Sequence, residues 1–284
     1  MSVDAHAPLG TPATGTPASG TPTSGTPAQL GTRALSVGYQ GDPILHDVTV
    51  EIPAGRITAL IGANGCGKST LLKTIARVLG AHGGAVLLDG REVESISRRA
   101  FALKLAALPQ SPIAPEGLTV RELCRFGRHP HRGFAGRPGK GDDDAISRAL
   151  AGAGMSDLAD APLDELSGGQ RQRAWIAMAL AQETEILLLD EPTTYLDIAH
   201  QTDVLRLVQR LNAEHGRTIV MVLHDLNQAA RYAHHIIAVA GGGVAAEGPP
   251  SEVIIPDVIR EVFGLECAVV PNPLNGTPLC LPLD

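Results

Sequence analysis

One short stretch, residues 62–70 with the sequence GANGCGKST, constrains what this chain can fold into more than any other. It matches G-x-x-x-x-G-K-[ST], in which glycines let backbone N–H groups approach phosphate oxygens, Lys68 brings a charge to the β- and γ-phosphates, and Ser69 offers a hydroxyl to Mg²⁺. Residues 56–61 before it read as a strand and residues 69–79 after it as a helix, which places the phosphate at a helix N-terminus. An ordinary Gly-rich turn is the alternative, and it leaves the complete motif unexplained. The expected nucleotide-binding residues here are Gly62, Ala63, Asn64, Gly65, Cys66, Gly67, Lys68, Ser69 and Thr70.

The composition narrows the class of protein. The chain has 284 residues, 44% of them hydrophobic and 19% charged, as expected of a globular protein. A net charge of −7 and only 3% aromatic residues argue against a nucleic-acid partner, because such proteins use basic surfaces and stacking side chains. The four cysteines show no C-x-x-C spacing, and no apolar run approaches the ~18 residues of a membrane span. We therefore expect a soluble intracellular chain.

The chain divides into a tail and one folded domain. Residues 10–28 repeat a Gly-Thr-Pro-rich unit that can bury almost nothing, so residues 1–29 are predicted to be a flexible tail and residues 30–284 the folded domain. Alternating strands and helices predict a mostly parallel, helix-covered sheet. Residues 111–165 interrupt this alternation with short helical patterns and Gly/Pro-rich loops, and predict an inserted helical subdomain.

Periodicity and turn signals define the expected elements. The expected strands cover residues 34–37, 48–52, 56–61, 85–88, 186–189, 218–223, 235–240 and 244–246. The expected helices cover residues 69–79, 119–126, 142–150, 156–159, 168–181, 198–211 and 225–232, followed by one helix and a hairpin turning at residues 275–276. The helix 198–211 is amphipathic, and its expected buried face holds Ile198, Val204, Leu205, Val208 and Leu211.

Two acids follow the apolar strand 186–189. Asp190 at the strand end is suited to hold hydrated Mg²⁺, and Glu191 beside it is suited to take a proton from an attacking water. A capping pair before Pro192 would explain one acid. A capping pair does not explain why acids follow a buried strand of the type that accompanies a phosphate loop.

A second anion site is predicted at residues 166–170, with the sequence LSGGQ. Ser167 is a good N-cap for the following helix, and two glycines expose backbone N–H groups. Taken alone, the segment is equally well a capped helix. Beside the phosphate loop, it resembles the signature of ATP-binding cassette (ABC) proteins. The resemblance implies that the signature of one copy closes over ATP bound to the phosphate loop of another, with Ser167, Gly168, Gly169 and Gln170 as nucleotide contacts.

The other motifs of that family occur in the expected order. The resemblance implies that Tyr39 stacks on adenine, Gln110 contacts Mg²⁺ and the attacking water, Asp197 contacts the partner copy, and His224 senses the γ-phosphate. A packed core tyrosine and a structural histidine are the ordinary alternatives. The candidate catalytic residues are Lys68, Gln110, Glu191 and His224, and the candidate Mg²⁺ ligands are Ser69, Gln110 and Asp190.

The implied fold is an α/β P-loop NTPase (RecA-like) core with a mostly parallel sheet, an N-terminal antiparallel β subdomain and the inserted helical subdomain. The implied activity is hydrolysis of ATP with Mg²⁺ by a homodimer. This homodimer would power separate multi-span permease subunits from the cytoplasmic face of the membrane. An extracytoplasmic substrate-binding protein would be an indirect partner, and no nucleic acid would be bound.

Three segments narrow the subclass. Residues 127–131, 192–201 and 223–229 are similar to the ATPases of iron–siderophore, haem and vitamin B12 importers. A soluble ABC ATPase of translation or DNA repair and the ATPase of an exporter are the alternatives. His129 and His131 suggest a metal pair, but without a third ligand a surface loop is favoured.

Overall fold

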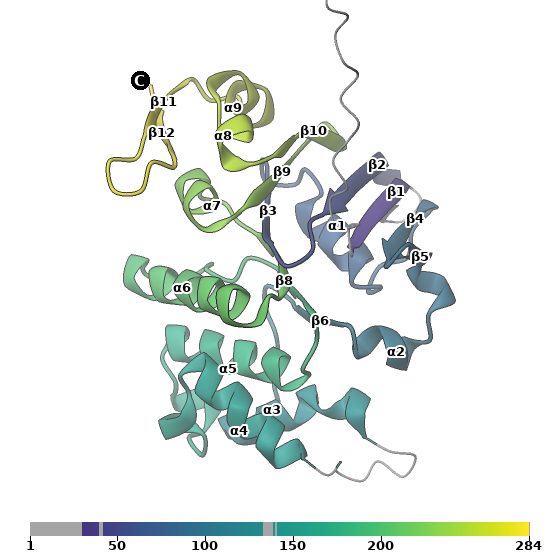
Figure 1. The fold of residues 1–284 in the computed structure, drawn as a ribbon, viewed down its shortest axis with the longest axis vertical. Helices are drawn as coiled ribbons and strands as arrows, with labels where there is room; N and C mark the ends of the chain where they lie inside the picture. The colour runs from purple at the N-terminus through teal and green to yellow at the C-terminus, as the bar shows by residue number, and fades with distance from the viewer. Residues whose placement is uncertain (1–29, 40–41, 133–138, 140, 284) are drawn as a thin grey trace, which may run out of the picture.

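A computed structural model describes residues 30–39, 42–132, 139 and 141–283 of the chain (Figure 1). The predicted tail, residues 1–29, lies outside this part. The strands are β1 (Leu30–Tyr39), β2 (Asp42–Ile52), β3 (Ile57–Ile61), β4 (Gly83–Leu88), β5 (Arg91–Glu92), β6 (Leu105–Leu108), β7 (Ile186–Leu189), β8 (Thr218–Val222), β9 (His235–Ala240), β10 (Gly243–Gly248), β11 (Cys267–Pro271) and β12 (Pro278–Pro282). The helices are α1 (Lys68–Ile75), α2 (Arg98–Ala102), α3 (Val120–Gly127), α4 (Asp142–Ala153), α5 (Gly168–Ala181), α6 (Ile198–His215), α7 (Leu226–Tyr232), α8 (Pro250–Val253) and α9 (Pro256–Phe263).

The central sheet has six strands in the order β10-β9-β3-β8-β7-β6. All neighbouring pairs are parallel except β9 and β10, which form the predicted hairpin. The parallel strands are mostly apolar because both faces of the sheet are covered. In β7, Leu187 and Leu189 pack into one core cluster, and Ile186 and Leu188 pack into the other. The mostly parallel α/β core is therefore confirmed.

A second, antiparallel sheet has the order β2-β1-β4-β5 and lies beside α1 (Figure 1). Its apolar face shares the core cluster that holds α1 side chains such as Leu71 and Ile75. This is the expected N-terminal antiparallel subdomain. Its strands are longer than predicted, because pairing continues into residues that carry no alternating pattern.

The described residues between β6 and β7 are mostly helical. Helices α3 and α4 pack against α5, and the three form the lower part of the molecule in Figure 1. Two of these helices begin with a capping box: Thr119 with Glu122 at α3, and Ser167 with Gln170 at α5. Helix α5 therefore starts at the predicted signature residue.

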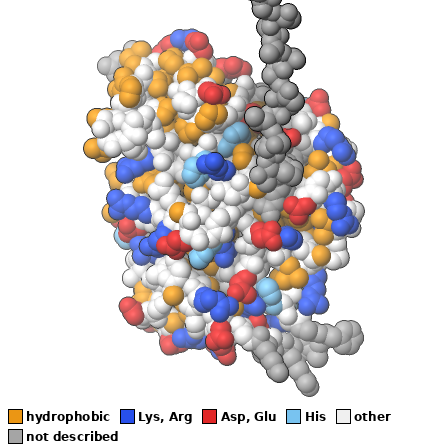
Figure 2. Space-filling view, in the orientation of Figure 1, with side chains coloured by type: hydrophobic (Ala, Val, Ile, Leu, Met, Phe, Trp, Pro, Cys, Tyr) orange, Lys and Arg blue, Asp and Glu red, His pale blue; other side chains and the backbone are white. Residues whose placement is uncertain are grey.

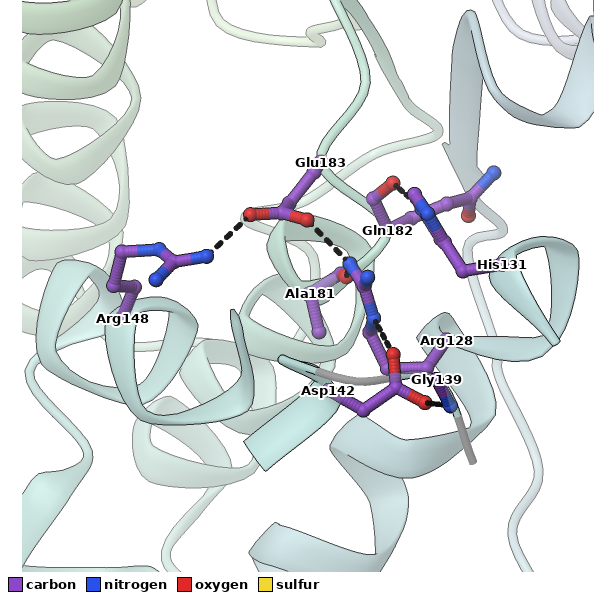
Figure 3. Close-up of polar contacts among 8 residues, drawn as sticks. All are labelled: Arg128, His131, Gly139, Asp142, Arg148, Ala181, Gln182 and Glu183. Carbon is purple, nitrogen blue, oxygen red and sulfur yellow. Dashed lines mark hydrogen bonds and ion pairs between the residues drawn. The ribbon is translucent and has the colours of Figure 1, made fainter. Parts of the chain in front are cut away.

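Figure 3 shows the polar contacts that hold this helical region together. Arg128, which is 6% exposed, follows α3 and donates to Asp142 Oδ1 at 2.8 Å and to Glu183 Oε2 at 2.6 Å. It also donates to the carbonyl oxygen of Ala181 at 2.7 Å. Since Asp142 begins α4 and Ala181 ends α5, one guanidinium joins all three helices.

Two expectations about helices are wrong. The helix after the phosphate loop ends at Ile75 and not at Leu79, because Arg77 has a positive φ of 57° that a helix cannot contain. Ile198 does not belong to the buried face of α6: it is 81% exposed, since it occupies the first helical position, before the packed stripe begins. Residues 105–108, which are not among the expected strands, form the edge strand β6.

Exposed apolar side chains gather at the C-terminal hairpin of β11 and β12, where Val270, Leu274, Leu281 and Leu283 are exposed. Figure 2 shows this concentration in the upper left, over the region that α8, α9 and the hairpin occupy in Figure 1. The predicted turn at residues 275–276 is present, with Gly276 at φ 73°. In the described part of the chain, no helix is both long and apolar enough to cross a membrane.

Candidate functional site

The candidate catalytic and Mg²⁺-binding residues meet at one edge of the central sheet. The phosphate loop follows β3, His224 follows β8, the acids Asp190 and Glu191 follow β7, and Gln110 follows β6. These four strands are neighbours and run parallel, so their carboxyl ends share an edge. Parallel α/β sheets bind ligands at that edge.

The start of the phosphate loop packs closely against strand β9. A Cβ at Gly62, which has φ 150°, would lie 2.3 Å from the carbonyl oxygen of Val239. Only glycine fits this close approach of two backbones. Lys68 is 5% exposed, and its Nζ donates to the carbonyl oxygens of Gly62 and Ala63, each at 2.8 Å. The ammonium is thus held over the loop, where phosphate oxygens would lie.

A hydroxyl and a carboxylate form a candidate Mg²⁺ site. Ser69 Oγ donates to Asp190 Oδ1 at 2.7 Å, and Asp190 Oδ2 is buried with no hydrogen-bond partner. Burial raises the pKa of Asp190 above its ordinary value, although the Ser69 hydroxyl pulls in the opposite direction. A buried carboxylate oxygen without a partner, next to a serine hydroxyl, is the donor set that a hard cation takes. The residues present therefore fit Mg²⁺.

The carboxylate of Glu191 is held on both oxygens. His224 Nε2 lies 2.7 Å from Oε1, while the Thr194 hydroxyl at 2.9 Å and the Gln110 amide both donate to Oε2. Glu191 itself has a positive φ of 51°. Three loops from three strand ends thus fix one side chain, which is how a proton acceptor is held in a defined direction.

Gln110, which was expected to contact Mg²⁺ and the attacking water, lies next to Glu191. Its amide nitrogen contacts Glu191. Among the hydrogen bonds of the described residues, none joins Gln110 to Ser69 or Asp190. The Thr194 contact was not anticipated, although Thr194 lies in the segment 192–201, which also contains Asp197.

The signature residues form a separate group. Ser167 caps α5 and accepts from the Gln170 N–H at 3.3 Å, while its own N–H donates to Gln170 Oε1 at 2.9 Å. Asp197 caps α6 in the same way, accepting from the His200 N–H at 2.9 Å. Hydrogen bonds from the backbone and the ring of His200 lower the pKa of Asp197. Within the residues that the structure describes, no hydrogen bond or ion pair joins Ser167, Gly168 or Gly169 to the phosphate loop.

Two further predicted residues lie outside both groups. Tyr39 ends β1 in the antiparallel sheet, is 48% exposed, and so presents a ring that is free to stack. His131 belongs to a short 3-10 helix at residues 129–131, and its Nε2 lies 2.8 Å from the carbonyl oxygen of Gln182 (Figure 3). In the described ranges, no group of three or more His, Cys, Asp or Glu side chains could hold a metal ion.

Comparison with known proteins assigns the family. A family model described as ABC transporter matches residues 45–194. The "Probable siderophore transport system ATP-binding protein YusV" of Bacillus subtilis (strain 168) is 52% identical, with 89% of this chain and 92% of that protein covered. The "Ferric enterobactin transport ATP-binding protein FepC" of Escherichia coli (strain K12) is 48% identical, with 90% and 94% covered.

A solved structure agrees with these relatives. The dimeric structure of MJ0796, a bacterial ABC transporter cassette, superposes with a TM-score of 0.67 at 28% identity, covering 78% of this chain and 98% of that one. The fold, the order of the motifs and the sequence relatives all point to one family. The chain therefore belongs to the ABC transporter family, as one of its ATP-hydrolysing subunits.

Proposed function

We propose that two copies of this chain bind two ATP molecules between them, head to tail, and that their hydrolysis powers import of an iron–siderophore or related metal chelate through separate permease subunits. The observation that supports this proposal best is that the predicted nucleotide contacts form two separate groups within one chain. The phosphate loop, the acids and His224 share one sheet edge, whereas the capped, N–H-rich start of α5 belongs to the helical region. A second copy supplies the missing half. The dimeric cassette of similar fold supports this arrangement.

The residues of the sheet edge have distinct roles in this proposal. Lys68 and the loop N–H groups hold the β- and γ-phosphates, and Tyr39 stacks on the adenine. Ser69 and Asp190, assisted by Gln110, hold Mg²⁺, which neutralises charge on the phosphate oxygens when bound. The signature residues Ser167, Gly168, Gly169 and Gln170, together with Asp197, contact the nucleotide of the partner copy.

Glu191 acts on the attacking water. Its carboxylate accepts a proton from the water as the water oxygen attacks the γ-phosphorus and the bond to the bridging oxygen of ADP breaks. His224 and Gln110 hold that carboxylate in place, and the Thr194 hydroxyl adds a third contact. Precise orientation matters because proton transfer needs hydrogen-bond reach to the water.

The substrate class rests on relatives and on local sequence. The relatives named above serve siderophore and ferric enterobactin transport, and a B. subtilis relative with 51% identity is named an iron(3+)-hydroxamate import ATP-binding protein. The segments 127–131, 192–201 and 223–229 resemble the same subclass. These likenesses favour an importer over an exporter or a soluble ATPase of translation or repair.

The same relatives support a coupling of this chain to the membrane. The segment of about residues 111–165, reached through Gln110, would act as a subdomain that carries closure of the dimer to the permease, and hydrolysis would reopen it. The chain would sit at the cytoplasmic face of the membrane, and an extracytoplasmic protein would deliver the chelate.

Uptake of radioactive ferric siderophore in a deletion strain tests this proposal. Wild-type chain should restore uptake, and Glu191→Gln at equal abundance should not. The assay should include hydroxamate and catecholate chelates and haem, because the names of the similar proteins differ in the chelate. Uptake of none of these, with ATP hydrolysis intact, would refute the substrate class.

A further inference from the structure

Two glutamines join the first turns of α6 and α7. Gln228 Nε2 donates to Gln201 Oε1 at 2.7 Å, and Gln201 Nε2 donates to the carbonyl oxygen of Leu196 at 3.0 Å. Both glutamines belong to segments that resemble the importer subclass, residues 192–201 and 223–229. The roles proposed above make no use of either one.

On one side, the neighbours of Gln201 lie against the signature of their own chain. A Cβ at Gly169 would lie 2.3 Å from His200 Cδ2, so the His200 ring fills the space that this glycine leaves open. Leu196 occupies the corresponding place at Gly168, with its Cδ2 3.4 Å from such a Cβ. The start of α6 therefore forms the support on which the signature glycines rest.

The His200 ring is itself fixed. Its Nδ1 lies 2.9 Å from Asp197 Oδ2, and its backbone N–H donates to Asp197 Oδ1 at 2.9 Å. Gln201 is the next residue in the helix. A displacement of the signature toward α6 would therefore press on the first turn of α6, which Asp197 caps.

On the other side, Gln228 lies in the helical turn that follows His224, the residue that contacts Glu191. Its backbone N–H donates to the cap residue Asp225 at 2.9 Å, and His224 is the residue before that cap. The same turn is held from its other face by Asn227, which exchanges two hydrogen bonds with the backbone of Cys280 at 3.2 and 2.8 Å. The first turn of α7 thus has two fixed neighbours, and one of them is α6.

We propose that Gln201 and Gln228 are positioning residues that tie the signature, through His200 and Asp197, to the orientation of His224 and Glu191. The inference rests on the proposed dimer, in which the signature of one copy engages the ATP of the other. When the signature of one copy binds the ATP of the other, the orientation of Glu191 in the first copy would therefore change. Turnover at the two sites becomes interdependent through this link.

The test is a double-mutant cycle with Gln201→Leu, Gln228→Leu and the double variant, plus Gln228→Glu, which keeps the size but loses the donor. Gln209→Leu, an exposed change on the same helix, is the matched control. ATP turnover is measured for kcat, KM and Hill coefficient, and thermal unfolding is measured for each variant.

We expect each single variant to lower kcat by about 2- to 30-fold and to move the Hill coefficient toward 1. KM and Tm should stay near those of wild type and Gln209→Leu. The double variant should be no slower than the slower single variant, because both remove one link. Single variants with wild-type kcat and Hill coefficient, or losses that multiply, would overturn the proposal.

Glu191→Gln is measured alongside to separate this link from the proposed function. Turnover near that of the wild type in that variant would contradict the role of the base. Loss of turnover in Glu191→Gln, combined with unaffected glutamine variants, would refute the link alone.

Discussion

His224 Nε2 lies 2.7 Å from Glu191 Oε1, so the side chains that follow β8 and β7 meet at the carboxyl edge of the central sheet. The two strands are paired in parallel, from Ile186 with Thr218 to Leu189 with Met221. The register of two buried strands therefore sets the distance between the histidine and the acid. The contact between His224 and Glu191 therefore depends on how β7 and β8 pack in the core.

Replacing Glu191 with Gln should reduce ATP turnover by at least 100-fold, the contribution typical of a positioned general base. The amide cannot accept the proton of the attacking water, yet it can still accept hydrogen bonds from Thr194 and Gln110. ATP binding, measured by equilibrium dialysis, should stay within a few-fold of wild type. A variant with wild-type turnover would remove Glu191 from its role.

Replacing Asp190 with Asn should stabilise the nucleotide-free chain while removing Mg²⁺-dependent turnover. Because burial raises the pKa of Asp190, the native state binds this proton more tightly than the unfolded state. Stability is therefore lost as the pH rises from 3.8 through the raised pKa, and asparagine avoids that loss.

At pH 7.5 we expect Asp190→Asn to raise Tm by about 2–4 °C, the shift that accompanies about 1 kcal/mol in a chain of this size. The gain should shrink at pH 5. The exposed acid Asp89 gives the matched control Asp89→Asn, which should leave Tm and turnover unchanged. A lower Tm for Asp190→Asn at pH 7.5 would contradict this account.

Alkylation should select Cys66 and block ATP binding, and prior MgATP should protect the thiol. Cys66 is half-buried in the phosphate loop, with its Sγ 3.8 Å from Lys68 Nζ, whereas the other three cysteines are buried. Burial raises the pKa of Cys124 to about 12 and that of Cys280 to about 11, which makes both thiols unreactive. Mass spectrometry of labelled peptides measures this. Equal labelling with and without MgATP would place Cys66 away from the nucleotide.

Replacing Arg128 with Met should destabilise the helical region by about 3–5 kcal/mol, because it leaves the buried Asp142 carboxylate without its cation. The hydrogen bonds of Arg128 and Gly139 hold the pKa of Asp142 below its ordinary value, against the opposing effect of burial. Urea unfolding measures the loss.

The same network offers two controls (Figure 3). Arg148→Met removes an exposed partner of Glu183 and should cost less than about 1 kcal/mol. Arg128→Met combined with Asp142→Asn should recover part of the stability, because no buried charge remains unpaired. A loss of stability for Arg128→Met as small as that for Arg148→Met would contradict the role of Arg128 in joining the three helices.

Much of the core could be predicted because its signals are local. Strand β7 and helix α5 have the predicted bounds, since continuous apolar runs, caps and motif spacing lie within a few residues of each other. The fold class and the family of the chain follow from the same motifs. The phosphate loop, Asp190, Glu191, Gln110 and His224 were expected near one another, and the order of the strands brings them to one edge.

Contacts between segments far apart in the sequence could not be predicted. Nothing near Arg128 indicates that it reaches Ala181 and Glu183, and nothing near Gln201 indicates Gln228. Such pairs depend on how whole helices pack. The exposure of Ile198 has the same origin, because the apolar pattern of α6 does not show where its packed stripe begins.

Light scattering of Glu191→Gln tests the shared-site dimer most directly. With MgATP the variant should have the mass of two chains, and without nucleotide the mass of one. Adding Gly169→Asp to Glu191→Gln should keep ATP binding but leave a monomer, because the carboxylate would repel the partner's phosphates and collide with His200. A monomer of Glu191→Gln that holds MgATP, or a dimer that survives Gly169→Asp, would contradict the central claim.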